Sequence, residues 1–324
     1  MNRHHNLRLS ALALAAAACL PAWSAPVISA DSAAAAFDGT ANVAGTPSTN
    51  TSPGYVNSIT QSNQAQGTAT GYAFANQFGA YAVNSSAEGK GNASAQAKLQ
   101  YTLMNSSALA QSYTMSFYIY GGYLEAMTAF NGPGLSGSES LSAGYTASIK
   151  AGSNTVFSSG ATFTRTDGLT TLVKTGTELS NASASASMYA WSGATYSIEL
   201  GVLGAGESMD VLAQLDDMTV SDVGTYIYSG GGGYGYQCSG GGGYNAIGGM
   251  STMAVALDDV TCFKGNARAF YGDPVDFDDQ TPPTAVTFVG TAVGQVPEPG
   301  TLALVALALV AAATGRRRKH AAPA

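Results

Sequence analysis

The feature that most constrains this fold is an alternation of apolar and polar side chains. In Ser112–Tyr120, the apolar positions are taken by Tyr113, Met115, Phe117 and Ile119. A period of two with strong β-forming residues is typical of a strand with one buried face. The same period recurs at residues 99–103, 195–200 and 209–215. The sequence therefore predicts an all-β fold, which we expect to be an antiparallel, jelly-roll-like β-sandwich.

The connections between these runs predict two antiparallel strand pairs. A short polar stretch joins residues 99–103 to 112–120, and the glycine turn Gly204–Glu207 joins residues 195–200 to 209–215. Such short connections favour neighbouring strands, so we expect each pair of runs to form a hairpin. Further strands are predicted at residues 144–150 and 155–164, turns at residues 131–134 and 166–168, and short strands on a thin core at residues 67–98.

The N-terminus has the pattern of a secretory signal peptide. Arg3 and Arg8 precede the apolar run Leu9–Leu20, and small residues follow it. This order of charge, apolar run and small-residue site predicts cleavage after Ser24. A lipoprotein signal at Cys19 is the alternative, but the alanines before it lack the leucine that such a signal needs.

The C-terminus has three parts in a fixed order. Pro297 and Pro299 hold the chain extended and accessible. The apolar run Thr301–Thr314 follows, and then the four cations at residues 316–319. As a helix, the run would span about 21 Å, against about 30 Å for a bilayer core, and the cations would stay in the cytoplasm. The alternative is a buried C-terminal helix of a soluble domain.

Over Val296–His320 the chain resembles PEP-CTERM proteins, an exported bacterial class whose tail is recognised by an exosortase. The Pro-Glu-Pro triplet, the apolar span and the basic end are all present in order. The resemblance implies a sorting signal that is cut near the prolines, an exosortase-type partner and a chain held in the inner membrane before processing. It also implies a final place at the cell surface or in the extracellular matrix, near exopolysaccharide or biofilm. The implied sorting residues are Pro297, Glu298, Pro299, Gly300, Arg316, Arg317 and Arg318.

These signals divide the chain into four parts. The predicted boundaries are 1–24 for the signal peptide, 25–279 for the β-sandwich body, 280–295 for a linker and 296–320 for the sorting segment.

The charge and histidine content of the body exclude several functions. All 20 acidic residues but only seven of the 13 basic residues lie between Asp31 and Glu298, which gives a net charge near 7 − 20 = −13. Nucleic acid is therefore not an expected partner. The histidines His4, His5 and His320 all fall in removable ends, so the mature body lacks histidine-based nucleophile systems and the usual zinc ligands.

The chemistry that remains for an enzyme is a carboxylate pair for glycoside hydrolysis. Candidate carboxylates are Glu125, Glu199, Glu207 and Asp216, but Trp191 is the single tryptophan that survives processing. We therefore expect a non-enzymatic surface or matrix protein. A carbohydrate-binding protein is the first alternative, and a carboxylate-dependent glycoside hydrolase is the second.

Two cysteines remain after signal removal. Cys238 lies in the glycine-rich stretch Gly230–Gly249, for which we expect a mobile loop, and Cys262 follows it. In an oxidising compartment, an even pair predicts one disulfide, worth about 3 kcal/mol. Two free buried thiols are the alternative.

Four aspartates lie close together in the sequence, at Asp273, Asp276, Asp278 and Asp279. Oxygen-rich turns suit Ca²⁺, but the spacing is not that of an EF-hand. The alternative is a solvated acidic turn, and no other cofactor is expected.

A passive, modified coat component is a further possibility. Five Asn-x-Ser/Thr triplets begin at Asn50, Asn84, Asn92, Asn105 and Asn181.

Overall fold

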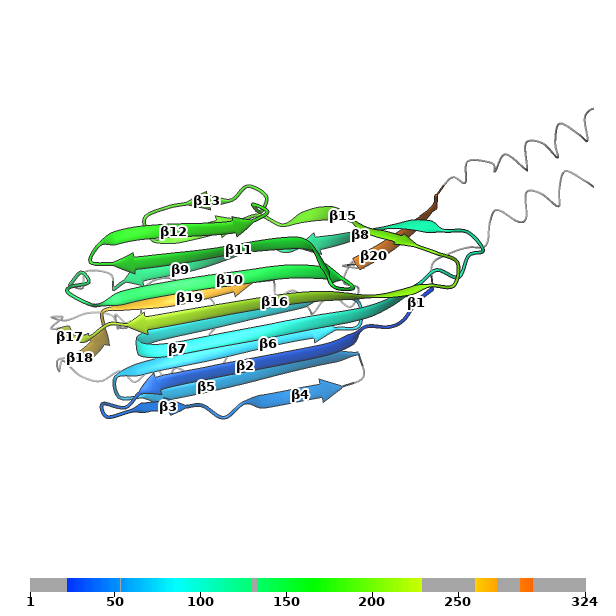
Figure 1. Ribbon diagram of the computed structural model, residues 1–324. Helices are drawn as coiled ribbons and strands as arrows, with labels where there is room; N and C mark the ends of the chain where they lie inside the picture. Colours follow the sequence, from blue (N-terminus) through cyan, green and yellow to red (C-terminus); the bar gives the residue numbers. More distant parts are fainter. Residues whose placement is uncertain (1–21, 53, 130–132, 229–259, 273–285, 294–324) are drawn as a thin grey trace, which may run out of the picture.

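The computed structural model describes residues 22–52, 54–129, 133–228, 260–272 and 286–293. Strands make up most of this part, and no helix occurs among the described residues (Figure 1). The predicted all-β, antiparallel fold is confirmed. The predicted signal peptide and C-terminal helix lie almost entirely outside the described residues.

The strands follow one another closely along the chain. The first ten are β1 (Ala22–Trp23), β2 (Val27–Phe37), β3 (Asn42–Ala44), β4 (Ser48–Ser52), β5 (Tyr55–Gln64), β6 (Gly67–Asn76), β7 (Tyr81–Met104), β8 (Gln111–Ile119), β9 (Gly122–Thr128) and β10 (Ser140–Ala151). The next ten are β11 (Asn154–Thr166), β12 (Leu169–Gly176), β13 (Ser183–Ala184), β14 (Met188–Trp191), β15 (Ala194–Leu203), β16 (Ser208–Asp222), β17 (Thr225–Tyr228), β18 (Val260–Phe263), β19 (Gly265–Tyr271) and β20 (Val286–Ala292).

Fifteen of these strands form one sheet that is organised around β7. Its central path is β12-β11-β10-β16-β7-β19-β9-β14-β13, and β1, β2 and β6 also pair with β7. The first part of β7 pairs with β6 and β19, whereas the second part pairs with β2 and β16. One strand therefore belongs to both halves of the sheet.

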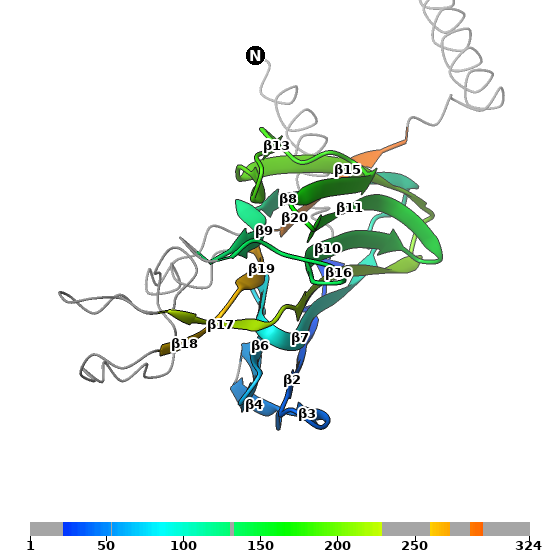
Figure 2. The same ribbon diagram turned by 90° about the vertical axis from the view of Figure 1, so that its left-hand side faces the viewer.

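The change of partners along β7 occurs at Gly89 and Lys90. Gly89 has a φ of 64°, and its carbonyl oxygen accepts hydrogen bonds from the Val223 N–H and the Ser221 hydroxyl. The Lys90 N–H donates to the carbonyl oxygen of Gln66. This corner folds the sheet over, so that its two halves lie face to face in a sandwich-like arrangement (Figure 2).

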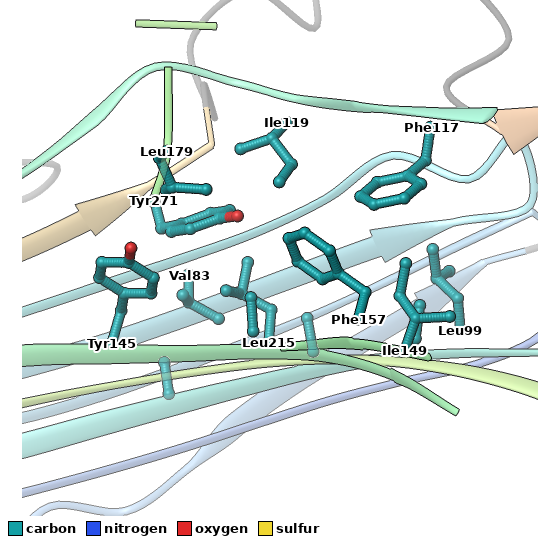
Figure 3. Packing of buried hydrophobic residues seen from close by; sticks show 14 of the residues in the cluster. Val83, Leu99, Phe117, Ile119, Tyr145, Ile149, Phe157, Leu179, Leu215 and Tyr271 are labelled. Carbon is teal, nitrogen blue, oxygen red and sulfur yellow. The ribbon is translucent and has the colours of Figure 1, made fainter. Parts of the chain in front are cut away.

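A separate three-stranded sheet, β15-β8-β20, completes the main core. Its Phe117 lies edge-on against Phe157 of β11, with ring centroids 5.2 Å apart. Tyr145 of β10 and Tyr271 of β19 lie tilted against each other, with ring centroids 5.1 Å apart (Figure 3). The alternating apolar residues predicted for residues 112–120 thus face this core, and Tyr113, Met115, Phe117 and Ile119 are all buried.

Around residues 67–98 the molecule has the predicted thin core, but the predicted short strands are wrong, because β6 has 10 residues and β7 has 24. Ala34, Ala69 and Ala93 form a small buried cluster between β2, β6 and β7. A Cβ atom on Gly71 would lie 2.8 Å from the carbonyl oxygen of Ala33, so the two layers approach too closely for a side chain at this position. Small residues are required because there is no room between the layers for larger ones.

Both predicted hairpins are wrong, although their strands exist. The strand at residues 111–119 pairs with β15 and β20, not with β7, and β16 pairs with β7 and β10, not with β15. The two connections carry the chain from one sheet to the other instead of turning it back. By contrast, β10 and β11 pair as neighbours, and Asp167 and Gly168 form the predicted turn after β11.

The ends of the folded body also differ from the predicted boundaries. Residues 286–292, which we predicted to be part of a linker, form β20 in the core. Val286 and Phe288 alternate with exposed residues and are buried, so these seven residues complete a sheet. At the other end, β1 lies within the predicted signal peptide and would be removed with it.

Candidate functional site

A groove of about 440 Å³ crosses the outer face of β2, β7, β16, β10 and β11. Its central row of side chains follows the cross-strand register: Asp31, Gln96, Asp216 and Thr146 are successive partners, with Gly160 beyond them. Neighbouring strands lie about 4.8 Å apart, so Asp31 and Thr146 stand about 14 Å apart along this row. The groove is therefore a line of polar groups on a rigid sheet.

The adjacent row explains why the surface is hollow. Ala33, Ser94, Met218, Gly144 and Thr162 are successive partners there. Four of these side chains are small or absent, which leaves free volume above the backbone. Met218 is half-exposed and supplies an apolar side chain next to the polar row.

The carboxylate of Asp216 is held by three donors. The Gln96 amide donates to its Oδ1. The Gln214 amide donates to Oδ2 at 2.8 Å, and the Thr146 hydroxyl does so at 3.4 Å. These contacts come from three strands, so the sheet fixes the carboxylate in one orientation.

Asp217 lies directly beneath the groove, on the inner face of β16. Its side chain is 3% exposed, and neither carboxyl oxygen makes a hydrogen bond of regular geometry. Burial raises the pKa of Asp217 well above its ordinary value, and the nearby Ser85 hydroxyl and Ala95 N–H offset this only in part. The carboxyl group is therefore kept in its neutral form.

The four candidate carboxylates lie on separate elements. Glu199 is exposed on β15, and Glu207 caps its own turn by accepting a hydrogen bond from the Gly204 N–H at 2.7 Å. Glu125 lies opposite Arg268 of β19; burial raises its pKa, and the Arg268 charge partly opposes this. Asp216 alone among these four lines the groove.

Other predicted site residues fall partly or wholly outside the described part of the chain. Cys262 is buried in β18, but Cys238 lies outside the described residues, so the disulfide stays a prediction. The acidic cluster at residues 273–279 and all sorting residues lie outside as well. Within the described residues, no group of three or more histidine, cysteine or acidic side chains could hold a metal ion.

One of the five predicted modification sites is unsuited to its role. Asn105 is fully buried, and its side-chain amide donates to the carbonyl oxygens of Leu109, Leu203 and Gly204. Asn50, Asn92 and Asn181 are exposed, and Asn84 is half-buried.

Sequence reasoning missed most of the groove. The sequence does not reveal the row of Asp31, Gln96 and Asp216, because it depends on strand register between residues 96 − 31 = 65 and 216 − 96 = 120 positions apart. A signal for Asp217 was present, since the inward alternation of Val211, Ala213 and Leu215 continues to it. Following this period would have predicted a buried carboxyl group.

A family model described as the PEP-CTERM protein-sorting motif matches residues 295–319. The chain carries a PEP-CTERM sorting motif. The match confirms the resemblance that the sequence showed over residues 296–320. No curated protein and no solved structure matches the chain.

The PEP-CTERM motif marks the chain as an exported protein that is sorted through an exosortase-type enzyme. No helix in the described ranges is long and apolar enough to cross a membrane. The motif covers the C-terminal end alone, so the role of the β body has to be argued from the groove.

Proposed function

We propose that this PEP-CTERM protein is a non-enzymatic component of the cell surface or extracellular matrix whose groove binds neutral glycan chains of an exopolysaccharide. The observation that carries the proposal is the row formed by Asp31, Gln96, Asp216 and Thr146 on one sheet face. Carboxylate, amide and hydroxyl groups in a line suit the many hydroxyl groups of an extended sugar chain.

The groove is pre-organised for such a ligand. Because three protein donors already hold Asp216, its remaining lone pairs point in fixed directions and can accept sugar hydroxyl groups without rearrangement. The half-exposed Met218 offers an apolar contact for the C–H face of a ring. Polar and apolar contacts thus lie side by side, as glycan recognition requires.

The charge of the groove favours a neutral chain. Asp31 and Asp216 line it, and its lining includes no lysine or arginine. Lys98 lies one row away, two residues along β7 from Gln96. An anionic polysaccharide would meet two carboxylates at short range, which costs binding free energy.

We propose binding without catalysis because the groove lacks a second carboxyl group suited to proton donation. Asp31 is exposed, and the buried Asp217 points to the opposite face of the sheet from Asp216. A glycoside hydrolase needs an acid and a second carboxylate on either side of one glycosidic bond.

Binding to soluble polysaccharides tests the proposal. Isothermal titration calorimetry measures the affinity of the full chain for neutral dextran or a neutral exopolysaccharide and for anionic alginate. We expect Asp216→Ala and Gln96→Ala to weaken binding of the neutral chain at least about tenfold, as expected for loss of buried or charged hydrogen bonds. The matched control is Ser197→Ala, on the exposed face of β15.

Two results would count against the proposal. Equal affinities of Asp216→Ala, Gln96→Ala and Ser197→Ala for the neutral polysaccharide would mean that the glycan binds outside the groove. Release of reducing sugar ends during the titration, lost in Asp216→Ala, would show that the groove is a hydrolase site.

A further inference from the structure

We propose that the end of the β body at the β7–β8 connection is a membrane-facing platform, which rests on the neutral lipid surface of the bilayer while the chain awaits processing. This platform is formed by exposed apolar side chains around residues 104–110 and is separate from the groove. The proposal rests on the sorting motif and does not depend on glycan binding.

Both ends of the described chain lie at this place. The Val293 N–H, just after β20, donates to the carbonyl oxygen of Ala110 at 3.0 Å. At the other end, Ala22 of β1 pairs with Met104. β1 and β20 leave the body at the same end of the sheets (Figure 1). The two predicted membrane-directed segments are thus continuous with one end of the fold.

The distance from this end to the bilayer is short. The family match begins at residue 295, two residues after Val293, and the apolar run begins at Thr301. Thr301 follows Val293 by eight positions, and at about 3.5 Å per position the chain between them reaches at most about 28 Å. The tether therefore keeps the platform within reach of the lipid surface, and even a weak contact becomes intramolecular.

Five exposed side chains at this end are apolar. The exposed fractions are 72% for Val27, 43% for Met104, 45% for Leu109, 59% for Val202 and 41% for Val293. Pairing of Val202 with Ser112 and of Val27 with Gln100 places both near the β7–β8 connection. Apolar side chains of this kind bind membranes by entering the boundary between headgroups and acyl chains.

Asn105 makes this end rigid. Its amide group donates to backbone oxygens of Leu109, Leu203 and Gly204, and its own backbone bonds to Gly206 and Glu207. The connections at residues 104–110 and 203–208 are therefore locked together. Leu109 and Val202 are presented on a fixed surface, so their insertion costs little conformational entropy.

The charges nearby decide which lipid the platform would meet. Glu207 and Asp210 are exposed at this end, and Lys150 is the exposed cation at the corresponding end of β10. With carboxylates in excess, we expect a better fit to zwitterionic than to anionic headgroups.

Quenching of a tryptophan reporter by brominated lipid tests the platform. The full chain is placed in phosphatidylcholine nanodiscs as Leu109→Trp, Val202→Trp or the control Leu169→Trp. Leu169 is 68% exposed but lies at the opposite end of the sheet, next to the turn after β11. Of the two native tryptophans, Trp191 is buried in the core and contributes a constant background. Trp23 pairs with Leu103 at the platform itself, so it is replaced by phenylalanine in every variant.

We expect brominated discs to lower the emission of Leu109→Trp and Val202→Trp about twofold, since an interfacial side chain lies about 5–10 Å into the headgroup and acyl boundary. Leu169→Trp should not respond. Adding Asp216→Ala should leave the quenching unchanged, which separates this result from failure of glycan binding. Brominated phosphatidylglycerol discs should quench the emission at positions 109 and 202 less than brominated phosphatidylcholine discs do.

Unchanged emission at positions 109 and 202 in chains that remain in the disc would overturn the proposal. Emission changes that require the processing enzyme in the same membrane would also overturn it, because the platform would then face a protein instead of lipid.

Discussion

At the scale of single residues, Asp217 and Asp216 show how one position along a strand decides the state of a carboxyl group. Asp216 faces solvent and is held by three donors, whereas Asp217 faces the interior and has no regular hydrogen bond. An ionised carboxylate without partners is very costly in a protein interior. The buried group therefore holds its proton, and this links the stability of the body to pH.

Asp217→Asn should stabilise the body at neutral pH. The folded-state pKa is raised above the unfolded value of about 4, so the folded state binds more protons. The free energy of unfolding therefore falls as pH rises above about 4, by at most about 1.4 kcal/mol per pH unit, until the folded carboxyl group titrates. Asp217→Asn should remove this slope, as measured by urea denaturation between pH 4 and 8.

The control for this prediction is Asp222→Asn, on the same strand but exposed. It should keep the slope of the unmodified chain. If the unfolding free energy of Asp217→Asn changed with pH as steeply as that of Asp222→Asn, Asp217 would be ionised in the folded body.

Glu139 behaves in the opposite way. Burial alone would raise its pKa, but hydrogen bonds from Lys264 and from the N–H groups of Gly224 and Ser136 lower it to about 2. These contacts join the segment before β10 to the segments that flank β17 and β18. The Glu139 Oε1–Lys264 Nζ distance is 2.9 Å, and both side chains are less than one-fifth exposed.

Glu139→Gln should lower the free energy of unfolding by about 2 kcal/mol at pH 7, the usual range for a charged hydrogen bond. Because the folded pKa is depressed, this contribution is present above the unfolded pKa and is lost as pH falls towards 2. Denaturation of both proteins at pH 7 and pH 2 should show the difference closing. Glu178→Gln, which removes the exposed ion pair with Lys174, should change little at either pH.

At the scale of elements, the sequence predicted strands better than their partners. Period-two alternation depends on neighbouring residues, so the runs at residues 112–120 and 209–215 were recognisable. The partners depend on the connection, and there the buried Asn105 ties two loops together instead of forming a hairpin turn. Nothing in its local sequence distinguishes this asparagine from one in an ordinary polar turn.

The corner in β7 is the element that brings the two halves of the sheet together. Gly89 has a φ of 64°, and a Cβ atom there would overlap the Gln66 carbonyl oxygen and lie 2.6 Å from a ring carbon of Phe263. Both the backbone conformation and the space therefore demand glycine.

Gly89→Ala should destabilise the body more than Gly152→Ala does. Gly152 has a similar φ of 58°, but a Cβ atom there meets nothing within 4 Å, so it reports the conformational cost alone, about 1–2 kcal/mol. The added clash at Gly89 should cost about 2 kcal/mol more. Urea denaturation of the two variants measures the difference, and equal losses would show that the corner can relax.

At the scale of the whole molecule, the sequence predicted the sorting signal better than the structure of the β body. The sorting signal was readable because its three parts are contiguous over residues 296–320, and the family match at residues 295–319 confirms it. The groove was not, because its central row joins residues from β2, β7, β16 and β10. The boundary between body and signal was misplaced for a related reason. By composition, residues 286–292 resemble a Thr- and Val-containing linker, and only their pairing with β8 shows that they form a strand.

β20 should be essential for the fold, whereas everything after it should be dispensable for stability. Val286 and Phe288 are buried, and the Phe288 ring lies 5.3 Å from that of Tyr101. A chain ending at residue 285 loses these contacts and should be destabilised by at least about 4 kcal/mol, the cost of removing one large buried aromatic side chain. A chain ending at Val293 keeps β20 and its bond to Ala110, and its melting temperature should equal that of the full chain in detergent. If both shortened chains melted together, β20 would contribute nothing, and the folded body would end before it. If both behave as expected, cutting near Pro297 releases a body whose stability is complete without the sorting segment.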